Sequence, residues 1–391
     1  MTKSKKWYEN SDISTPAYIF NLDKLTQRVQ DIRQSLPPQV KFCYAMKANP
    51  FIIDHLAEKV DYFEVCSPGE FKICEMSSIP ISKVIMSGVY KNEIDMDYAI
   101  KVYREDITYT VESLRQWKVL QGLAEVHDVK LKLIIRLTSG NQFGMEGEDI
   151  YNLLSKNPSK HIEIIGIQYF TGTMKCSKKK FQRDLIKVSE MINRLEAEYG
   201  FKELTLEYGP GLAVDYFDEN PNLEKEIIDH LNEVLLELDP KRKITLEMGR
   251  YVVASCGSYV TTVVDAKNNK NDHYCIVDGG INHINYYGQN MAMKLPPIKQ
   301  TKEQGHEQTW TIFGALCTTS DILARNVSLK NLEIGDRLLF ERTGAYSMTE
   351  GISLFLSRAM PRVYFISEVD GLKKVRERIE TYSMNYIERG N

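Results

Sequence analysis

A lysine at the end of an apolar run is the first residue whose position suggests chemistry. Lys47 closes the run VKFCYAMK at residues 40–47, and this pattern predicts a strand whose last side chain is partly buried. Burial disfavours an ammonium ion, and the neutral amine is a nucleophile that forms Schiff bases with carbonyl compounds. A lysine at a strand end also commonly extends to solvent. Lys47 alone therefore leaves both roles open.

Glycines and an arginine after two later strands indicate an anion site. Gly209, Pro210 and Gly211 follow the run LTLEYG, and Gly249 and Arg250 follow KITLEM. Glycines let backbone N–H groups approach a phosphate, and the arginine guanidinium adds a forked donor. The alternative is a tight turn and a surface arginine. The pairing of the two loops favours a phosphate site.

An acid, a thiol and a phenol complete the set of candidate residues. Glu247 lies just before Gly249-Arg250, where a carboxylate beside a pyridine ring would keep the ring nitrogen protonated. Its alternative role is an ordinary ion pair. Cys317 and Asp321 share the run GALCTTSD at 314–321, and Tyr346 follows a glycine in TGAY. Taken singly, the last two runs are ordinary turns.

The elements that must position these residues alternate regularly. Eight strand candidates, separated by helical patterns, occur at 40–47, 61–65, 83–88, 107–111, 130–137, 162–170, 204–209 and 243–249. This order predicts a parallel (β/α)8 barrel, with a doubly wound open sheet as the alternative. Active sites of such barrels form where strands end, which would also gather Arg136, Phe170 and Thr173.

After Arg250 the pattern changes to β-rich runs separated by turns. These runs are SYVTTVVDAK, HYCIVDGGIN, QTWTIFGALC, DRLLFERTGAY and RVYFIS. We therefore predict an α/β barrel domain at residues 25–260 and an all-β domain formed by residues 1–24 and 261–391.

Composition excludes several classes of protein. The chain has 391 residues, of which 43% are hydrophobic and 26% charged, with a net charge of −3. This is typical of a soluble globular protein and gives no sign of nucleic-acid binding. No signal-peptide core or long apolar stretch occurs, so we expect a cytoplasmic protein that does not bind membranes. Seven scattered cysteines without a C-x-x-C pair argue against disulfides and a metal site.

Nine runs occur in this order along the chain: YAMKANP, FEVCSPGEF, GIQYFTGTMK, LEYGPGLAVDY, LEMGRYVVA, IVDGG, GALCTTSD, GDRLLFERTGAY and FLSR. Over nearly its whole length the chain resembles the fold type III pyridoxal-phosphate-dependent decarboxylases, the ornithine and diaminopimelate decarboxylase family. The resemblance implies an alanine racemase-like barrel that binds pyridoxal 5'-phosphate and a C-terminal β domain joined by the N-terminal strand. It also implies a homodimer with active sites between subunits.

The resemblance also implies a role for each candidate residue. Lys47 matches the lysine that forms the Schiff base with the cofactor, and Glu247 matches the partner of the pyridine nitrogen. Cys317 matches the thiol that the second subunit contributes and that protonates the substrate carbon after carbon dioxide leaves. The remaining cofactor-binding matches are Phe170, Thr173, Gly209, Gly211, Gly249, Arg250 and Tyr346.

Several positions depart from the family pattern. Phe170 replaces the histidine that stacks on the cofactor ring, and a phenyl ring can stack but cannot donate a hydrogen bond. Thr318 stands where diaminopimelate decarboxylases have a glutamate that holds the distal amino group, and Leu356 replaces an asparagine. The arginine that would grip a distal carboxylate is missing after residues 278–280. We expect Arg136 and Thr318 to face the substrate, and Asp321 to be either a structural acid or one that faces the substrate.

These departures favour decarboxylation of an amino acid or amino-acid conjugate to the corresponding amine. The cysteine motif CTTSD is most similar to decarboxylases of specialised pathways, such as those of butirosin or staphyloferrin B biosynthesis. Within the class, the alternative is a meso-diaminopimelate decarboxylase of lysine biosynthesis. From another class, the alternative is an inactive, decarboxylase-like regulator.

Overall fold

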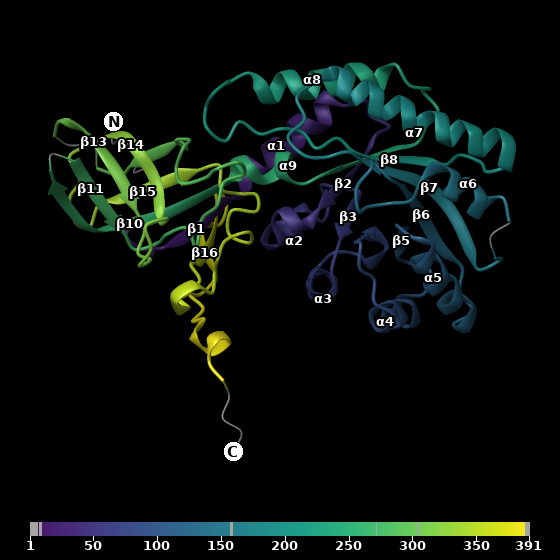
Figure 1. Cartoon of the computed structure of the whole chain (residues 1–391), viewed down its shortest axis with the longest axis horizontal. Coiled ribbons are helices and arrows are strands. Elements are labelled where there is room, and N and C mark those ends of the chain that lie inside the picture. Colours follow the sequence, from purple (N-terminus) through teal and green to yellow (C-terminus); the bar gives the residue numbers. More distant parts are fainter. Residues whose placement is uncertain (1–6, 8–9, 157–158, 271, 303–304, 388–391) are drawn as a thin grey trace. The chain divides into compact units, whose positions relative to one another are not determined.

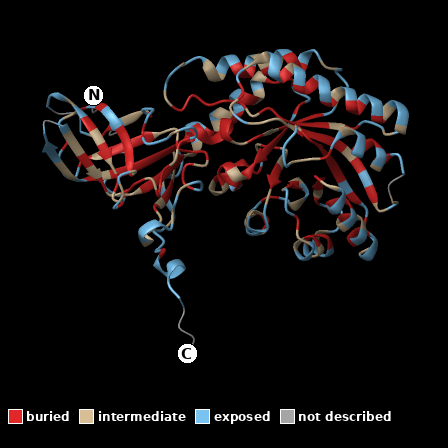
Figure 2. Cartoon of the chain, in the orientation of Figure 1, coloured by how far each residue is buried: buried red, intermediate tan, exposed pale blue. Residues whose placement is uncertain are grey.

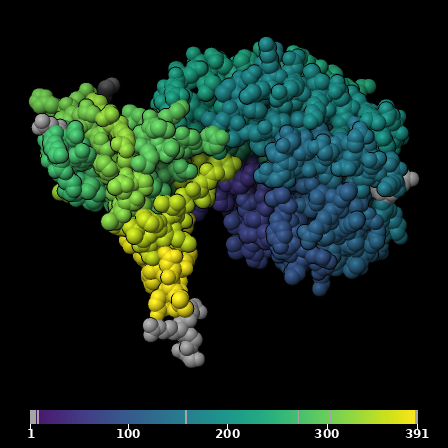
Figure 3. Space-filling model, viewed as in Figure 1, coloured from purple at the N-terminus to yellow at the C-terminus, as the bar shows by residue number. Residues whose placement is uncertain are grey.

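The computed structural model describes residues 7, 10–156, 159–270, 272–302 and 305–387. The chain forms two compact units. The barrel unit comprises Val29–Val214 and Asn222–Tyr251, and the sheet unit comprises Met1–Arg28, Asp215–Pro221 and Val252–Asn391. In Figure 3 most of the barrel unit is coloured purple to teal and most of the sheet unit green to yellow. Residues 1–6, 8–9, 271, 303–304 and 388–391, within the predicted β domain, lie outside the described residues.

Eight parallel strands close into a barrel, because β9 pairs with β2 as well as with β8. The strands are β2 (Lys41–Ala45), β3 (Tyr62–Val65), β4 (Val84–Met86), β5 (Thr108–Val111), β6 (Leu131–Leu137), β7 (Ile162–Phe170), β8 (Thr205–Gly209) and β9 (Ile244–Met248). All eight predicted strands are therefore present. The prediction of a closed barrel is confirmed, and the alternative of an open sheet is wrong.

Helices follow the strands and cover the outside of the barrel (Figure 1). They are α1 (Leu22–Ser35), α2 (Ile53–Leu56), α3 (Pro68–Met76), α4 (Glu93–Tyr103), α5 (Leu114–Val126), α6 (Gly147–Leu154), α7 (Lys178–Tyr199), α8 (Leu223–Leu236) and the short α9 (Arg250–Val253). Figure 2 shows buried strands and exposed outer faces on these helices, the pattern of amphipathic helices packed on a core.

Local sequence explains where two of the helices begin. The Ser67 hydroxyl accepts a hydrogen bond from the Glu70 N–H, so Ser67 caps α3. In the sequence, the helical pattern after the strand at 107–111 begins at Glu112, whereas in the structure Ser113 is the cap of α5 and Leu114 its first residue. The carboxylate of Glu112 instead binds Arg136 inside the barrel unit. That long-range ion pair was not visible in local propensity.

Side chains inside the barrel alternate with those that face the helices. The lower interior layer, at the amino-terminal ends of the strands, borders a cavity of about 320 Å³. Its members, one from each strand, are Lys41, Tyr62, Ile85, Thr108, Ile134, Ile165, Thr205 and Thr245. Two residues further along β3, β6, β8 and β9 are Glu64, Arg136, Glu207 and Glu247. This second layer, nearer the carboxyl ends of the strands, thus contains four charged residues, whereas the first contains Lys41 alone.

The sheet unit is built around a nine-stranded sheet with the path β14-β13-β11-β10-β1-β16-β17. The N-terminal strand β1 (Ala17–Asn21) pairs with β10 (Gly257–Asn269) and β16 (Arg362–Ser367). The other strands are β11 (Asp272–Val277), β12 (Ile298–Gln300), β13 (Glu307–Phe313), β14 (Ile322–Lys330), β15 (Arg337–Glu341) and β17 (Gly371–Arg376). Ile13, Ile19, Val260 and Leu339 form part of its core.

No helix within the described residues is long and apolar enough to span a membrane.

Candidate active site

A turn directly after β2 positions Lys47. Met46 and Ala48, on either side of it, are buried, while the Lys47 side chain is 39% exposed. Its Nζ atom donates a hydrogen bond to Oε2 of Glu64 over 2.6 Å and lies 3.5 Å from Oε1 of Glu247. The amine therefore faces two carboxyl groups that come from β3 and β9.

Glu64 and Glu247 form a coupled acid pair. Burial alone would raise the pKa of Glu64, but the positive charge of Lys47 and hydrogen bonds from Glu247 and Lys47 lower it to about 2. Burial and the negative charge of Glu64 raise the pKa of Glu247 well above its ordinary value. The pair therefore keeps one proton, which Glu247 carries and donates towards Glu64.

This acid pair suits a pyridine ring. Without the cofactor, the Glu247 carboxyl group holds a proton. A protonated ring nitrogen beside Glu247 would supply a proton in its place, so the carboxyl group itself could be ionised. Glu247 would then be the charged partner of the ring nitrogen. The chemistry of these donors therefore fits pyridoxal phosphate.

Glycines shape the loops after β7, β8 and β9. A Cβ atom on Gly209 would lie 2.6 Å from the Phe170 ring, and one on Gly211, whose φ is +56°, would lie 2.0 Å from the Gly172 carbonyl oxygen. A Cβ on Gly249 would lie 3.0 Å from that of Ala48, beside the Lys47 turn. Side chains are thus excluded where a phosphate would approach backbone N–H groups.

The predicted residues of this part of the site come together around those glycines. Phe170 packs against Gly209, and Gly172-Thr173 lies against Gly211. Thr173 is exposed, whereas Arg250, the first residue of α9, is only 9% exposed. A surface location for Arg250 is therefore excluded, and the loops form a cradle that fits a phosphate group.

A buried lysine that the sequence analysis missed holds these loops in place. The Nζ atom of Lys175 contacts Thr171 Oγ1 at 2.9 Å, Asp184 Oδ2 at 3.0 Å and the Tyr208 hydroxyl at 3.1 Å. It also lies 6.0 Å from the centre of the Phe170 ring. Its backbone N–H donates to the Gly211 carbonyl over 2.8 Å. Lys175 thus connects the loop after β7 to the end of β8 and to α7.

Arg136 is committed to contacts within the protein. It is 9% exposed, its Nη1 atom lies 3.2 Å from Oε1 of Glu112, and its guanidinium stacks 4.5 Å from the Phe143 ring centre. These contacts favour a supporting role for Arg136 over direct substrate binding.

Lys91 also follows a barrel strand, and it is buried. It is therefore an alternative candidate for the lysine that would bind the cofactor. Burial lowers the pKa of Lys91 to about 8. However, its Nζ atom donates to the Gly88 carbonyl over 2.7 Å and contacts the side chains of Thr110 and Gln116 at 3.3 Å each. None of these three partners is a carboxylate, so the acid pair that suits a pyridine ring is specific to Lys47.

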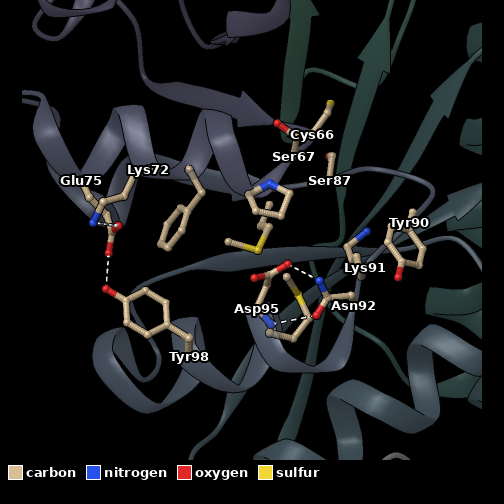
Figure 4. A pocket seen from close by; sticks show the side chains of 14 residues that line it. Cys66, Ser67, Lys72, Glu75, Ser87, Tyr90, Lys91, Asn92, Asp95 and Tyr98 are labelled. Carbon is tan, nitrogen blue, oxygen red and sulfur yellow. Dashed lines mark hydrogen bonds and ion pairs between the residues drawn. The ribbon is translucent and has the colours of Figure 1, made fainter. Parts of the chain in front are cut away.

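Lys91 borders a cavity of about 190 Å³ between α3 and α4. Figure 4 shows Lys91 and Tyr90 at one end and the hydrogen-bonded group of Lys72, Glu75 and Tyr98 at the other. Cys66 borders this cavity, and its Sγ atom lies 3.7 Å from Nζ of Lys47. The cavity therefore adjoins the site without containing its lysine.

The other predicted residues lie in the sheet unit. Cys317 is exposed, and Thr318 Oγ1 lies 3.0 Å from Ser320 Oγ. Asp321 is 1% exposed and accepts hydrogen bonds from the Ile281 and Leu316 N–H groups over 2.8 and 2.7 Å. Of its two possible roles, structural or substrate-binding, these contacts favour the structural one. Tyr346 follows Gly344-Ala345 and has a φ of +62°.

Reasoning from sequence missed Glu64, Gln168 and Glu207 as well as Lys175. Glu64 ends the run DYFEV, and its position at a strand end was a usable signal. Gln168 and Glu207 lie within apolar strands, where only the closed barrel shows that they point inward. Among the described residues, no group of histidine, cysteine, aspartate or glutamate side chains is arranged to hold a metal ion.

Comparisons with known proteins agree with this geometry. The family model "Pyridoxal-dependent decarboxylase, pyridoxal binding domain" matches residues 22–254. The chain is 24% identical to an L-glutamyl-[BtrI acyl-carrier protein] decarboxylase of Niallia circulans, over 89% of this chain and 87% of that protein. It is 28% identical to a diaminopimelate decarboxylase of Aquifex aeolicus, over 85% of this chain and 82% of that protein.

Two further comparisons extend over nearly the whole chain. A 2-[(L-alanin-3-ylcarbamoyl)methyl]-2-hydroxybutanedioate decarboxylase of Staphylococcus aureus is 26% identical over 90% of this chain and 94% of that protein. The crystal structure of diaminopimelate decarboxylase from Helicobacter pylori with L-lysine superposes with a TM-score of 0.83 at 23% identity, covering 95% of this chain and 96% of that one. The chain belongs to the family of pyridoxal-phosphate-dependent amino-acid decarboxylases.

Proposed function

We propose that this decarboxylase acts on an amino acid or amino-acid conjugate other than free meso-diaminopimelate and releases the corresponding amine. The observation that carries the proposal is that the loop at 314–321 presents no exposed carboxylate. Its carboxylate, Asp321, is buried and bound by two backbone N–H groups, and Thr318 follows the cysteine. The loop thus offers no exposed carboxylate to neutralise a distal ammonium group of a substrate.

The names of two relatives support a conjugated substrate. One names a glutamyl group on an acyl-carrier protein, and the other names an alanine unit joined to a hydroxybutanedioate. Neither name describes a free diamino acid. We infer that the substrate of this chain also carries a group other than an ammonium at its distal end.

The residues of the barrel unit would hold the cofactor. Lys47 would bind it covalently through its amine, Glu247 would face the ring nitrogen, and Phe170 would pack against the ring. Thr173, Gly209, Gly211, Gly249 and Arg250, with Tyr346 of the sheet unit, would bind the phosphate. When bound, pyridoxal phosphate supplies an electron sink for the electrons of the bond between Cα and the carboxylate.

The protein's own residues then manage charge and protons. Glu64 accepts a hydrogen bond from the Lys47 amine, and the proton that Glu247 holds in the cofactor-free protein would be replaced by the proton of the ring nitrogen. Replacement of the carboxylate by hydrogen consumes one proton for each carbon dioxide released. We propose that Cys317 of the partner subunit donates this proton to Cα, which requires a homodimer. Its exposed location supports this role.

The decisive experiment is carbon dioxide release by the cofactor-loaded protein. The panel would contain lysine, ornithine, arginine, glutamate, meso-diaminopimelate, glutamyl-carrier protein and citrate-linked diaminopropionate. We expect release from a conjugated or non-diamino substrate and little from meso-diaminopimelate. Activity confined to meso-diaminopimelate would refute our interpretation of Thr318 and Asp321.

A second candidate function is diaminopimelate decarboxylation itself. The 28% identity to the Aquifex aeolicus enzyme favours it. The same panel separates the two candidates, because each predicts a different active substrate. If none of the substrates reacted with protein that binds the cofactor, the regulator hypothesis would gain support instead.

A further inference from the structure

A third carboxyl group lies under the site and has no part in the proposed reaction. Glu207 of β8 is 0% exposed. Its Oε1 atom accepts a hydrogen bond from Nε2 of Gln168 over 2.7 Å, and its Oε2 atom has no hydrogen-bond partner among the described residues. Gln168 is the neighbour of Glu207 across the β7–β8 pair. The carboxyl group is therefore buried with only one of its oxygens satisfied.

Gln168 links this carboxyl group to the one predicted to face the cofactor. The same Nε2 atom that binds Glu207 lies 3.4 Å from Oε2 of Glu247. One amide group thus lies between the two acids, and Glu247 in turn faces Lys47. The geometry forms a continuous chain of polar groups from Glu207 to the Lys47 amine.

The charges in the barrel oppose ionisation of all three acids together. Glu64, Glu207 and Glu247 face the barrel interior with Lys47, while Arg136 is already paired with Glu112. Like charges at such separations in a buried site disfavour one another strongly. Burial, followed by the charge of Glu64, raises the pKa of Glu207 to about 7, although the hydrogen bond from Gln168 opposes this shift.

A cavity lies directly below Glu207. The space of about 320 Å³ at the amino-terminal ends of the strands has Glu207 among its lining residues. A polar cavity of this size can hold several water molecules. The ionisable groups around Glu207 are Cys43, Glu64, Glu247, Lys47 and Arg136 on the site side, and Lys41, Tyr62 and Lys243 on the cavity side. Protons could thus reach Glu207 from the side opposite the substrate.

We propose that Glu207 is a positioning residue whose charge, transmitted through Gln168, sets how tightly Glu247 holds the proton at the ring nitrogen of the cofactor. This inference rests on the proposed assignment of Glu247 to that nitrogen. An ionised Glu207 adds a negative charge near Glu247 and so strengthens proton binding there. A protonated Glu207 removes that charge and weakens proton binding.

The 15N chemical shift of the ring nitrogen in bound, 15N-labelled pyridoxal phosphate reports the proton at that nitrogen. We expect a spectral transition with a midpoint near pH 7 in the wild-type protein, which is where Glu207 titrates. Glu207→Gln keeps the shape of the side chain but cannot ionise, so it should abolish this transition. Thr205→Val, on the same strand and bordering the same cavity, is the matched control and should keep it. An identical transition in wild-type and Glu207→Gln protein would overturn the inference.

A second variant tests the link through Gln168. Gln168→Met removes a hydrogen bond that favours the ionised form of Glu207, so the midpoint should move upward by roughly one pH unit. An unchanged midpoint would overturn the role of Gln168 even if Glu207→Gln failed to fold.

Infrared spectroscopy of the cofactor-free protein supplies an independent readout. The wild-type protein should show the stretching band of a protonated carboxyl group that disappears between about pH 5 and 9, and Glu207→Gln should lack this band. A Glu207 band that does not titrate in this range would overturn the inference. Neither measurement needs turnover, so an inactive substrate panel would refute the proposed function and leave this test intact.

Discussion

The Nζ atom of Lys47 lies 2.6 Å from Oε2 of Glu64, a carboxylate that is only 3% exposed. Glu247 approaches the same amine from another strand, at 3.5 Å. The lysine is therefore held at one point of the barrel by two acids that differ in ionisation. This arrangement gives Lys47 a different environment from that of the two buried lysines, Lys91 and Lys175.

The first prediction follows from that difference. Borohydride reduction of the cofactor-loaded protein should attach the pyridoxyl group to Lys47, and peptide mass spectrometry would locate it. Lys47→Ala should lose both the label and the visible band of the bound cofactor, because no other lysine in the described part of the chain forms an ion pair with Glu247. Lys91→Arg is the control and should keep both. A label on Lys91 or Lys175 would show that the assignment of Lys47 is wrong.

The second prediction concerns the phosphate cradle. Gly211→Ala places a Cβ atom 2.0 Å from the Gly172 carbonyl oxygen at a positive φ, so the backbone must shift. We expect the Kd for pyridoxal phosphate to rise about tenfold or more, measured by fluorescence titration. Gly200→Ala is the control, because its φ of +75° is equally strained but no atom lies within 4 Å of its Cβ. Equal Kd values for the two variants would contradict the cradle.

The third prediction concerns Lys175. Lys175→Met leaves the buried Asp184 with only the exposed Arg183, 3.7 Å away, as a cationic partner, so unfolding should become easier by roughly 3 kcal/mol. The loops around Gly211 and Phe170 should also loosen and raise the Kd for the cofactor. Lys178→Met removes an exposed ion pair with Glu233 and should change neither quantity. A Lys175→Met protein with unchanged cofactor affinity would show that this network does not support the cradle.

The fourth prediction is a pH dependence of stability in the cofactor-free protein. The pKa of Glu207 is raised by burial from 4.5 to about 7 in the folded chain. Below pH 4.5 the group is protonated in both folded and unfolded states and has no effect, whereas above pH 7 its ionisation destabilises the fold. The contribution of Glu207 to stability should therefore become unfavourable between these values.

Glu207→Gln removes that penalty. Relative to the wild type, the variant should be more stable at pH 8 by an amount of up to roughly 3 kcal/mol and little changed at pH 5. Urea unfolding at the two pH values measures the difference. A variant that is equally destabilised at both values would indicate that Glu207 is ionised throughout and has no raised pKa.

The fifth prediction tests the homodimer and Cys317 together. Lys47→Ala and Cys317→Ala proteins should each be nearly inactive or misdirect protonation. Mixed after dissociation, they should recover about a quarter of wild-type activity, because half of the dimers are mixed and each contains one intact site. Cys176→Ala, at another exposed cysteine, should stay active. If mixing restores nothing, the cysteine does not come from the partner subunit.

The sequence by itself determined the order of the elements and the family. Alternating strands and helices predicted all eight barrel strands, since hydrophobic periodicity and caps such as Ser67 are local properties. Residues with a distinctive type at a strand end, such as Lys47, Glu247 and Gly211, could be selected in the same way. The start of α5 was wrong by two residues, because Glu112 is bound to Arg136 from another strand.

Only the tertiary structure decided which polar side chains share the barrel interior. Gln168 and Glu207 lie within strands whose sequences are largely apolar. The neighbouring residues in the sequence do not show that both side chains point into the barrel near Glu247. Nothing in the sequence around Lys175 shows that it is buried against Asp184, which lies nine residues further along the chain. Pairing across a closed barrel brings together residues from strands far apart in sequence. Their charges and protonation then depend on one another, which no single position in the sequence can record.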